Sequence, residues 1–222
     1  MGTFYGNVLV ARECAEVVPL LAGATGRDGG VLRGYAVPAG PGRTVVFPDP
    51  ETDAIDVAGP LSRLLGAATL SSYVHDSDVL DMRVFEGGEE RHFYDSYPGY
   101  FDAAETDENG DLVQDDEDDE DFAYPDPVGA DPEAFVPFAV EPVDSGVLES
   151  ALRGIPVDPE DGENGRYVFA DDQHYDVMEA LGLDGRRLST GYTYLSRGAL
   201  PEGLPLAELM VFGGACFSAA GE

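Results

Sequence analysis

Alternating hydrophobic and polar residues predict several β-strands along this chain. The segment from Thr3 to Ala11 is rich in aromatic and β-branched residues, which is typical of a strand. Two short segments, 34–37 and 44–47, flank a glycine- and proline-rich turn and are predicted to pair across it. Further strands are predicted at 166–169, at 192–195 and at 206–212, the last being ambiguous with a short helix.

The clearest hairpin pattern runs through residues 79–96. The alternation leads into a Gly-Gly pair at 87–88 and out again, and glycine suits a two-residue primed turn because both central positions need positive φ. One buried and one solvated face are typical of an antiparallel sheet. The cross-strand pairs that this turn predicts are Met82 with Phe93 on the buried face, and Arg83 with His92 and Asp81 with Tyr94 on the solvated face.

Hydrophobic residues at helical spacing predict helices between these strands. In segment 13–21, Cys14 falls on the apolar stripe, so we expect it in the core and not as a reactive thiol. The other helices are predicted at 53–65 with a late start or kink at Pro60, at 131–138 with an interruption at Pro137, at 144–153 with Asp144 as cap, and at 171–182 with Asp171 or Asp172 as cap and His174 on the apolar face.

Strands and helices follow one another without regular βαβ alternation. The sequence therefore predicts a single α+β domain over residues 1–222, with a mainly antiparallel twisted sheet and several short helices packed on it. Residues 102–121 interrupt the pattern, because 12 of these 20 positions are Asp or Glu and none is basic. Apolar segments resume afterwards, so we interpret 102–121 as an acidic loop insertion and 102–126 as a flexible part of the domain.

Charge narrows the possible partners. The chain has 44 acidic and 12 basic residues, a net charge of −32, and all 12 basic residues are Arg. Such a surface repels phosphate backbones and anionic lipid, so we expect no nucleic-acid partner and no membrane partner. The same field attracts basic proteins and divalent cations, although solubility alone is the simpler account of the charge.

The cysteines and the termini favour a cytoplasmic protein. Cys14 and Cys216 lie far apart in the sequence and form neither a CxxC pair nor a disulfide framework. The first residues lack the basic stretch and the long apolar run of a signal peptide, and no run of about 18 apolar residues occurs.

Several catalytic motifs are missing from the sequence. A chain without lysine has no P-loop lysine, no Schiff-base lysine and no protein-kinase lysine. The zinc-protease HExxH and the hydrolase GxSxG are missing as well. The only local pattern that suggests catalysis is His75 beside Asp76 and Asp78, where a carboxylate would orient a general base; a structural histidine at a strand end is the alternative.

A partial calcium-loop pattern lies inside the acidic segment. Carboxylate and amide oxygens at loop spacing surround a glycine at the position of the sharp turn, Gly110, which is the arrangement of an EF-hand loop. The simpler alternative is a β-turn at 109–110, because no entering helix precedes the loop. The candidate Ca²⁺ ligands are Glu105, Asp107, Asn109, Asp111 and Asp116.

Three stretches resemble a known group of sequences. They are MGTFYGNVLVARE, HDSDVLDMRVFEGGEERHFYDSYPGYF and YVFADDQHYDVMEALGLDGRRLSTGYTYLSRGALPEG, which together cover about a third of the chain. They resemble a family of uncharacterised bacterial proteins, mainly actinobacterial. The resemblance implies a bacterial cytoplasmic protein and transfers no catalytic residue.

Three functions remain open from sequence. The first is a non-enzymatic binding or regulatory protein, such as an immunity-like inhibitor, that engages a basic protein through its acidic surface. The second is a calcium-binding protein that works through residues 105–116. The third is a hydrolase of unfamiliar type built on His75.

Overall fold

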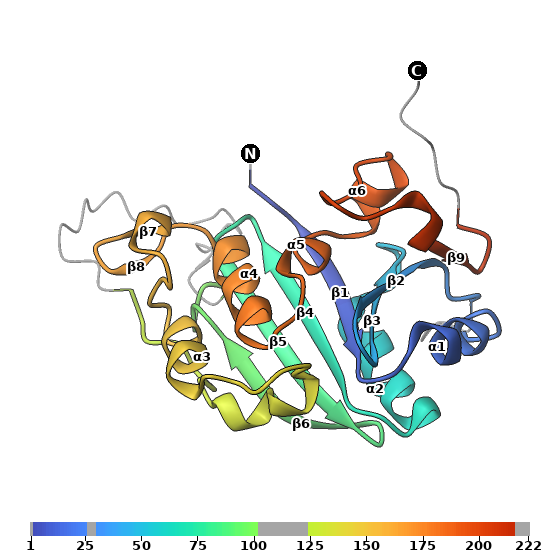
Figure 1. The fold of residues 1–222 in the computed structure, drawn as a ribbon, viewed down its shortest axis with the longest axis horizontal. Coiled ribbons are helices and arrows are strands. Elements are labelled where there is room, and N and C mark those ends of the chain that lie inside the picture. Colours follow the sequence, from blue (N-terminus) through green and yellow to red (C-terminus); the bar gives the residue numbers. More distant parts are fainter. Residues whose placement is uncertain (1, 26–29, 102–123, 216–222) are drawn as a thin grey trace, which may run out of the picture.

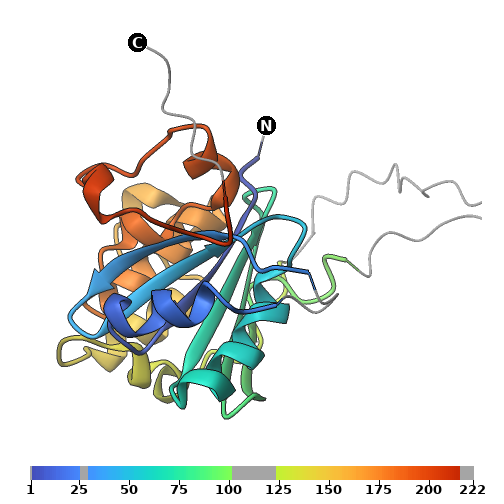
Figure 2. The same ribbon diagram turned by 90° about the vertical axis from the view of Figure 1, so that its right-hand side faces the viewer.

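The computed structural model describes residues 2–25, 30–101 and 124–215. They form a seven-stranded sheet with strand order β6-β5-β4-β1-β3-β2-β9, in which every neighbouring pair is antiparallel. Helices cover both faces of this sheet (Figures 1 and 2). The architecture confirms the predicted α+β class and the mainly antiparallel sheet.

The strands of the large sheet are β1 (Tyr5–Val10), β2 (Gly34–Gly40), β3 (Arg43–Pro48), β4 (Thr69–His75), β5 (Val79–Glu86), β6 (Glu89–Asp95) and β9 (Met210–Phe212). A separate small hairpin consists of β7 (Gly162–Glu163) and β8 (Arg166–Tyr167). The α-helices are α1 (Cys14–Leu21), α2 (Ala54–Leu65), α3 (Ser145–Leu152), α4 (Ala170–Ala180), α5 (Gly185–Leu188) and α6 (Tyr192–Ser196). Short 3₁₀ helices are η1 (Pro132–Ala134), η2 (Val136–Phe138), η3 (Pro159–Asp161) and η4 (Leu206–Glu208).

Alternate residues of the central strands supply two separate cores. In β1, Tyr5 and Leu9 point to the core beneath α3, α4, α5 and α6, while Val8 and Val10 point to the core beneath α1 and α2. Successive side chains of a strand point to opposite faces. Because helices cover both faces of this sheet, its central strands have no solvent-exposed face. Cys14 is buried in the core beneath α1, as predicted.

The helix predicted at 53–65 forms with two differences. It starts at Ala54 and continues through Pro60, so the late start is wrong. Buried contacts of Val57 and Leu61 on either side of Pro60 offset the hydrogen bond that proline cannot donate. Leu64, predicted on the buried stripe, is 54% exposed because it lies over the groove between α1 and α2.

The hairpin of β5 and β6 forms at Gly87 and Gly88, but the predicted pairing is wrong. A β-bulge between Val84 and Phe85 lets β6 gain one residue, so Met82 pairs with Tyr94 and Val84 with His92. Because one extra residue reverses the faces, Tyr94 is buried and Phe93 is not. The pairs that the bulge overturns are Met82 with Phe93, Arg83 with His92 and Asp81 with Tyr94.

The helices and strands after residue 124 are predicted less accurately. Residues 192–195 form the helix α6, not a strand, and residues 131–138 form two 3₁₀ turns instead of one helix. Asp144 caps α3 through its side chain as predicted, whereas α4 begins after Phe169, with both candidate cap aspartates already inside its first turn. His174 lies on the buried face of α4, as predicted.

One arginine fixes the 3₁₀ segment to the sheet. The Arg43 guanidinium donates hydrogen bonds to the carbonyl oxygens of Pro137, Phe138 and Ala139 at 3.0, 2.8 and 2.7 Å. Burial lowers the pKa of Arg43. Its charge therefore serves the fold and is not presented to a ligand.

The acidic insertion lies mostly outside the described residues, which resume at Tyr124. Among the described helices, none combines the length and the apolar character that crossing a bilayer requires.

Candidate functional site

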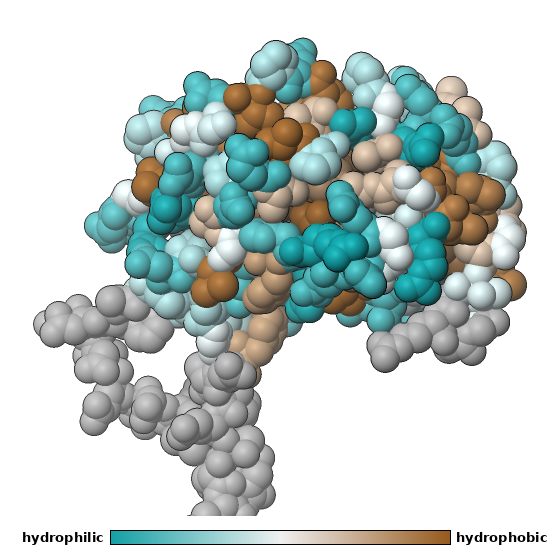
Figure 3. Space-filling model, turned by 90° about the horizontal axis from the view of Figure 1, so that it is seen from below, coloured by the Kyte–Doolittle hydropathy of each residue, from teal (hydrophilic) through white to brown (hydrophobic). Residues whose placement is uncertain are grey.

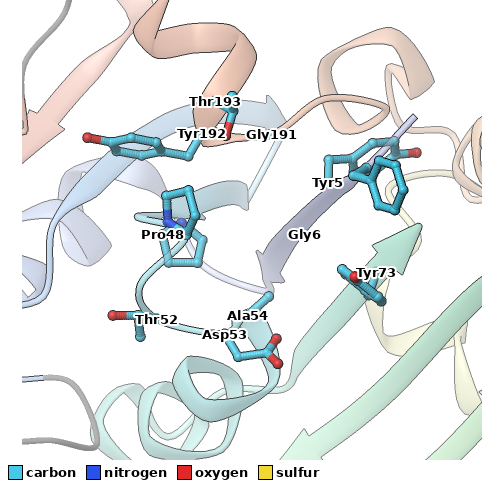
Figure 4. Close-up of a pocket in the computed structure, with 12 residues that line it drawn as sticks. Tyr5, Gly6, Pro48, Thr52, Asp53, Ala54, Tyr73, Gly191, Tyr192 and Thr193 are labelled. Carbon is cyan, nitrogen blue, oxygen red and sulfur yellow. The ribbon is translucent and has the colours of Figure 1, made fainter. Parts of the chain in front are cut away.

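A cavity of about 330 Å³ opens where five separate segments meet at one end of the sheet (Figure 4). We call it the Asp53 pocket. Its lining comes from the start of β1, the end of β3 and the following loop, the first turn of α2, β4, and the start of α6 with its N-cap. The lining residues are Phe4, Tyr5, Gly6, Pro48, Pro50, Thr52, Asp53, Ala54, Tyr73, Gly191, Tyr192 and Thr193.

Two glycines allow these segments to approach closely. A Cβ atom at Gly191 would lie 2.7 Å from Cβ of Tyr5, which is closer than side chains tolerate. A Cβ atom at Gly6 would lie 3.3 Å from Cβ of Ala54, at the start of α2. The backbone at Gly191 therefore lies directly against β1, and so does the start of α2. Any larger residue at Gly191 would push the start of α6 away from β1.

Among the described residues, Asp53 is the only carboxylate that lines the pocket, and neither arginine nor histidine lines it. It occupies the N-cap position of α2 but its side chain makes no capping hydrogen bond. The Tyr73 phenol lies near it, and burial together with the Asp53 charge raises the pKa of Tyr73. Figure 4 shows the Asp53 carboxylate and Tyr73 on the same side of the pocket, with Tyr192 and Thr193 of α6 opposite. The pocket thus offers one negative charge among aromatic rings.

These groups favour binding of a cation over catalysis. Aromatic ring faces attract cations, and a carboxylate adds a charge-assisted hydrogen bond. From sequence, Asp53 was expected only at the start of a helix and Tyr192 in a strand. The sequence predicted no site at these residues.

The structure places His75 among aromatic rings at the end of β4. The His75 ring lies 5.0 Å from Phe4 and 5.0 Å from Phe101 between ring centroids, and its Nδ1 is 3.1 Å from the Tyr73 hydroxyl. Among the described residues, no hydrogen bond joins the His75 ring to the carboxylate of Asp76 or of Asp78. The predicted histidine–carboxylate arrangement is therefore not assembled by side-chain hydrogen bonds.

Asp76 and Asp78, beside His75, belong to a tight turn. Asp76 and Ser77 have φ of 50° and 63°, and the Asp78 N–H donates to the His75 carbonyl oxygen at 2.9 Å, which forms the tight turn between β4 and β5. The Asp78 carboxylate accepts a hydrogen bond from the Tyr100 hydroxyl at 3.0 Å. The local sequence thus serves a turn whose two central residues both need positive φ.

A second cavity of about 420 Å³ lies near the small β7–β8 hairpin. Its walls carry four tyrosines, which are Tyr97, Tyr100, Tyr124 and Tyr167. Its charges are mixed, because Asp78 and Glu163 line it together with Arg166. Mixed charge gives this cavity no clear preference for a cation.

An apolar groove of about 930 Å³ separates α1 from α2, and its walls include Leu20, Leu61 and Leu64. Figure 3 shows brown hydrophobic residues gathered on the right, the side on which α1 and α2 lie in Figure 1, while hydrophilic residues cover most of the rest of that face. Among the described residues, Asp56 and Arg63 are the charged residues in its lining, and apolar side chains make up most of the rest.

A buried polar pair lies behind the Asp53 pocket. The Tyr5 hydroxyl is 2.8 Å from Nδ1 of His174, and both residues are buried. Burial raises the pKa of Tyr5 and lowers the pKa of His174 to about 3, so both side chains are neutral near pH 7. Within the described residues, the His174 Nε2 atom has no hydrogen-bond partner. The pair is enclosed and joins α4 to β1.

The candidate calcium ligands from Glu105 to Asp116 lie outside the described residues. Within residues 2–25, 30–101 and 124–215, no group of three or more His, Cys, Asp or Glu side chains is arranged to hold a metal ion. The calcium prediction therefore stays a prediction.

Comparison with known proteins finds no matching family model, no similar curated protein and no similar solved structure. The resemblance to uncharacterised bacterial proteins therefore stays an expectation, and the argument for function depends on the residues of this chain.

Proposed function

We propose that this protein is a non-enzymatic binding protein that engages a basic protein partner through its acidic surface. The observation that carries the proposal is that most of the arginines in the described part of the chain have partners within the chain. Seven of them form ion pairs with carboxylates: Arg12, Arg83, Arg91, Arg153, Arg166, Arg186 and Arg187.

The acidic residues far outnumber these arginines, so the surface keeps a large excess of negative charge. Two further arginines serve the backbone, since Arg43 binds three carbonyl oxygens at 137–139 and Arg63 donates to the Gly87 carbonyl oxygen. A strong field of one sign accelerates the approach of an oppositely charged protein and disfavours partners of like charge. Inhibition of a basic toxin or regulation of a basic protein is the role that we propose.

The Asp53 pocket supports a binding role over a catalytic one. It combines the Asp53 carboxylate with aromatic walls, which are the groups that hold a cationic side chain. Its volume of about 330 Å³ is at the lower end of the range for ligand sites, which suits a single side chain.

The test is a pull-down from lysate of the source organism at about 50 mM and at about 300 mM salt, because the Debye length falls from roughly 14 Å to roughly 6 Å between these concentrations. We expect a basic protein to be retained at low salt and lost at high salt. The purified partner should then bind in calorimetry with an affinity that falls as salt rises. Identical retained proteins at both salt concentrations, or a retained set that is not basic, would refute the proposal.

A further inference from the structure

We infer that the Asp53 pocket receives the side chain of one arginine of a basic partner and is the specificity site of the acidic surface. The inference rests on the proposed function for the origin of the arginine, and on the pocket itself for the chemistry of recognition.

Charge is the first step of the argument. Of the residues that the structure describes, Asp53 is the only carboxylate in the lining, and none with a positive charge lines the pocket. Within the described part of the chain no ion pair involves Asp53, and its side chain does not cap α2. A carboxylate that is uncommitted within the fold is available to a guanidinium from outside.

Aromatic rings are the second step. Phe4 and Tyr73 are 45% and 38% exposed, so their rings are accessible at the pocket mouth. Tyr192 lines the opposite wall and lies 4.9 Å from Tyr35 between ring centroids, which fixes its position. A guanidinium is planar and weakly hydrated, and it stacks on aromatic faces better than an ammonium does. This combination favours arginine over lysine.

The same chain contains an internal example of this recognition. The Arg83 guanidinium carbon lies 4.7 Å from the centroid of the Phe93 ring. Its nitrogens lie 3.2 Å from the Asp81 carboxylate and 3.4 Å from the Glu90 carboxylate. Ring and carboxylate thus hold a guanidinium at that site, and the Asp53 pocket presents both groups without an arginine of its own.

The first experiment titrates the ¹⁵N-labelled full chain with a blocked arginine, N-acetyl-arginine methylamide, and follows amide shifts by NMR. The control ligand is the citrulline analogue, which has nearly the same shape and no charge. We expect saturable shifts at Gly6 and Gly191 with a dissociation constant on the order of millimolar for arginine, and no saturable shift for citrulline. Equal binding of the two ligands, or arginine shifts confined to other surfaces, overturns the inference.

Two variants with the same change in net charge separate the pocket from the general field. Asp53→Asn removes the pocket carboxylate and keeps a residue that is equally favoured at an N-cap, so the fold should be retained. Glu51→Gln removes the charge of a residue two positions before Asp53. The Glu51 side chain does not line the pocket. We expect Asp53→Asn to weaken blocked-arginine binding at least about tenfold, and Glu51→Gln to change it less than twofold. Equal losses in both variants overturn the inference, and circular dichroism verifies that both variants fold.

The pull-down separates failure of this inference from failure of the proposed function. If wild type and both variants retain the basic partner equally, the acidic surface binds without the pocket, and only the inference fails. If no basic protein is retained but blocked arginine binds at Asp53, the inference about pocket chemistry holds and the proposed partner class is wrong.

Discussion

Acidification should destabilise this protein through His174. The ring is enclosed between α4 and β1, with the Tyr5 hydroxyl 2.8 Å from its Nδ1, and burial lowers its pKa from 6.5 to about 3. The unfolded chain binds a proton at His174 below about pH 6.5, whereas the folded chain does not. The free energy of unfolding is therefore unaffected above that pH and falls as pH decreases, by about 1.4 kcal/mol per pH unit, until the folded pKa is reached.

Between pH 7 and pH 5 this single group should lower the free energy of unfolding by about 2 kcal/mol. Other groups act in the opposite direction, because burial raises the pKa of Asp81 and of Asp172, which favours the folded state in acid. Protonation of surface carboxylates also relieves repulsion in so acidic a chain. The His174 contribution must therefore be isolated with a variant.

The matched variant is His174→Gln, which cannot titrate and keeps an acceptor for the Tyr5 hydroxyl. Urea unfolding followed by far-ultraviolet circular dichroism at pH 7 and pH 5 gives the two free energies. We expect the wild type to lose about 2 kcal/mol more than the variant over this interval. A difference below about 0.5 kcal/mol, or wild-type His174 ring signals in NMR that titrate between pH 7 and pH 5, would refute the reasoning.

Four further outcomes test the fold and the calcium hypothesis. Leu152→Ala should cost about 2–5 kcal/mol in urea unfolding, because Leu152 is fully buried; a cost below 1 kcal/mol contradicts its place in the core. Arg43→Met should cost about 2–3 kcal/mol by losing three charged hydrogen bonds to carbonyls, and proteolysis near η2 should increase. Asp144→Ala should lower the free energy of unfolding by about 1 kcal/mol. Asp144→Asn should lower it much less, because the Asn amide oxygen can accept the same capping hydrogen bonds at the start of α3 as the Asp carboxylate. Calorimetry with Ca²⁺ should show one saturable site that Asp107→Asn weakens, and no saturable heat would exclude the calcium loop.

Local pattern predicted those parts of the fold that depend on neighbouring residues. The Gly87-Gly88 turn, the Asp144 cap and the buried stripe of α1 follow from side-chain chemistry within a few positions. The bulge in β6 was missed because strict alternation from the turn assumes one residue opposite one residue. Residues 192–195 were assigned to a strand because so short an apolar segment does not distinguish a strand from one turn of helix.

The candidate site could not be predicted from sequence. The Asp53 pocket joins segments as distant as Phe4 and Thr193, and no local pattern signals that they meet. His75 with Asp76 resembled a catalytic pair because adjacency in sequence suggested adjacency in space. In the structure, positive φ at Asp76 and Ser77 makes this segment a turn.

The two outer strands of the sheet limit how a partner can attach. An open sheet invites strand addition wherever an edge exposes unpaired backbone groups. Here β9 has only three residues, and β6 begins with the charged run Glu89, Glu90 and Arg91. The other end of β6 is occupied, because Asp95 exchanges backbone hydrogen bonds with Val128 at 3.0 and 2.9 Å. The short β9, the charges at the start of β6 and the pairing at its end therefore disfavour addition of a foreign strand at these two edges.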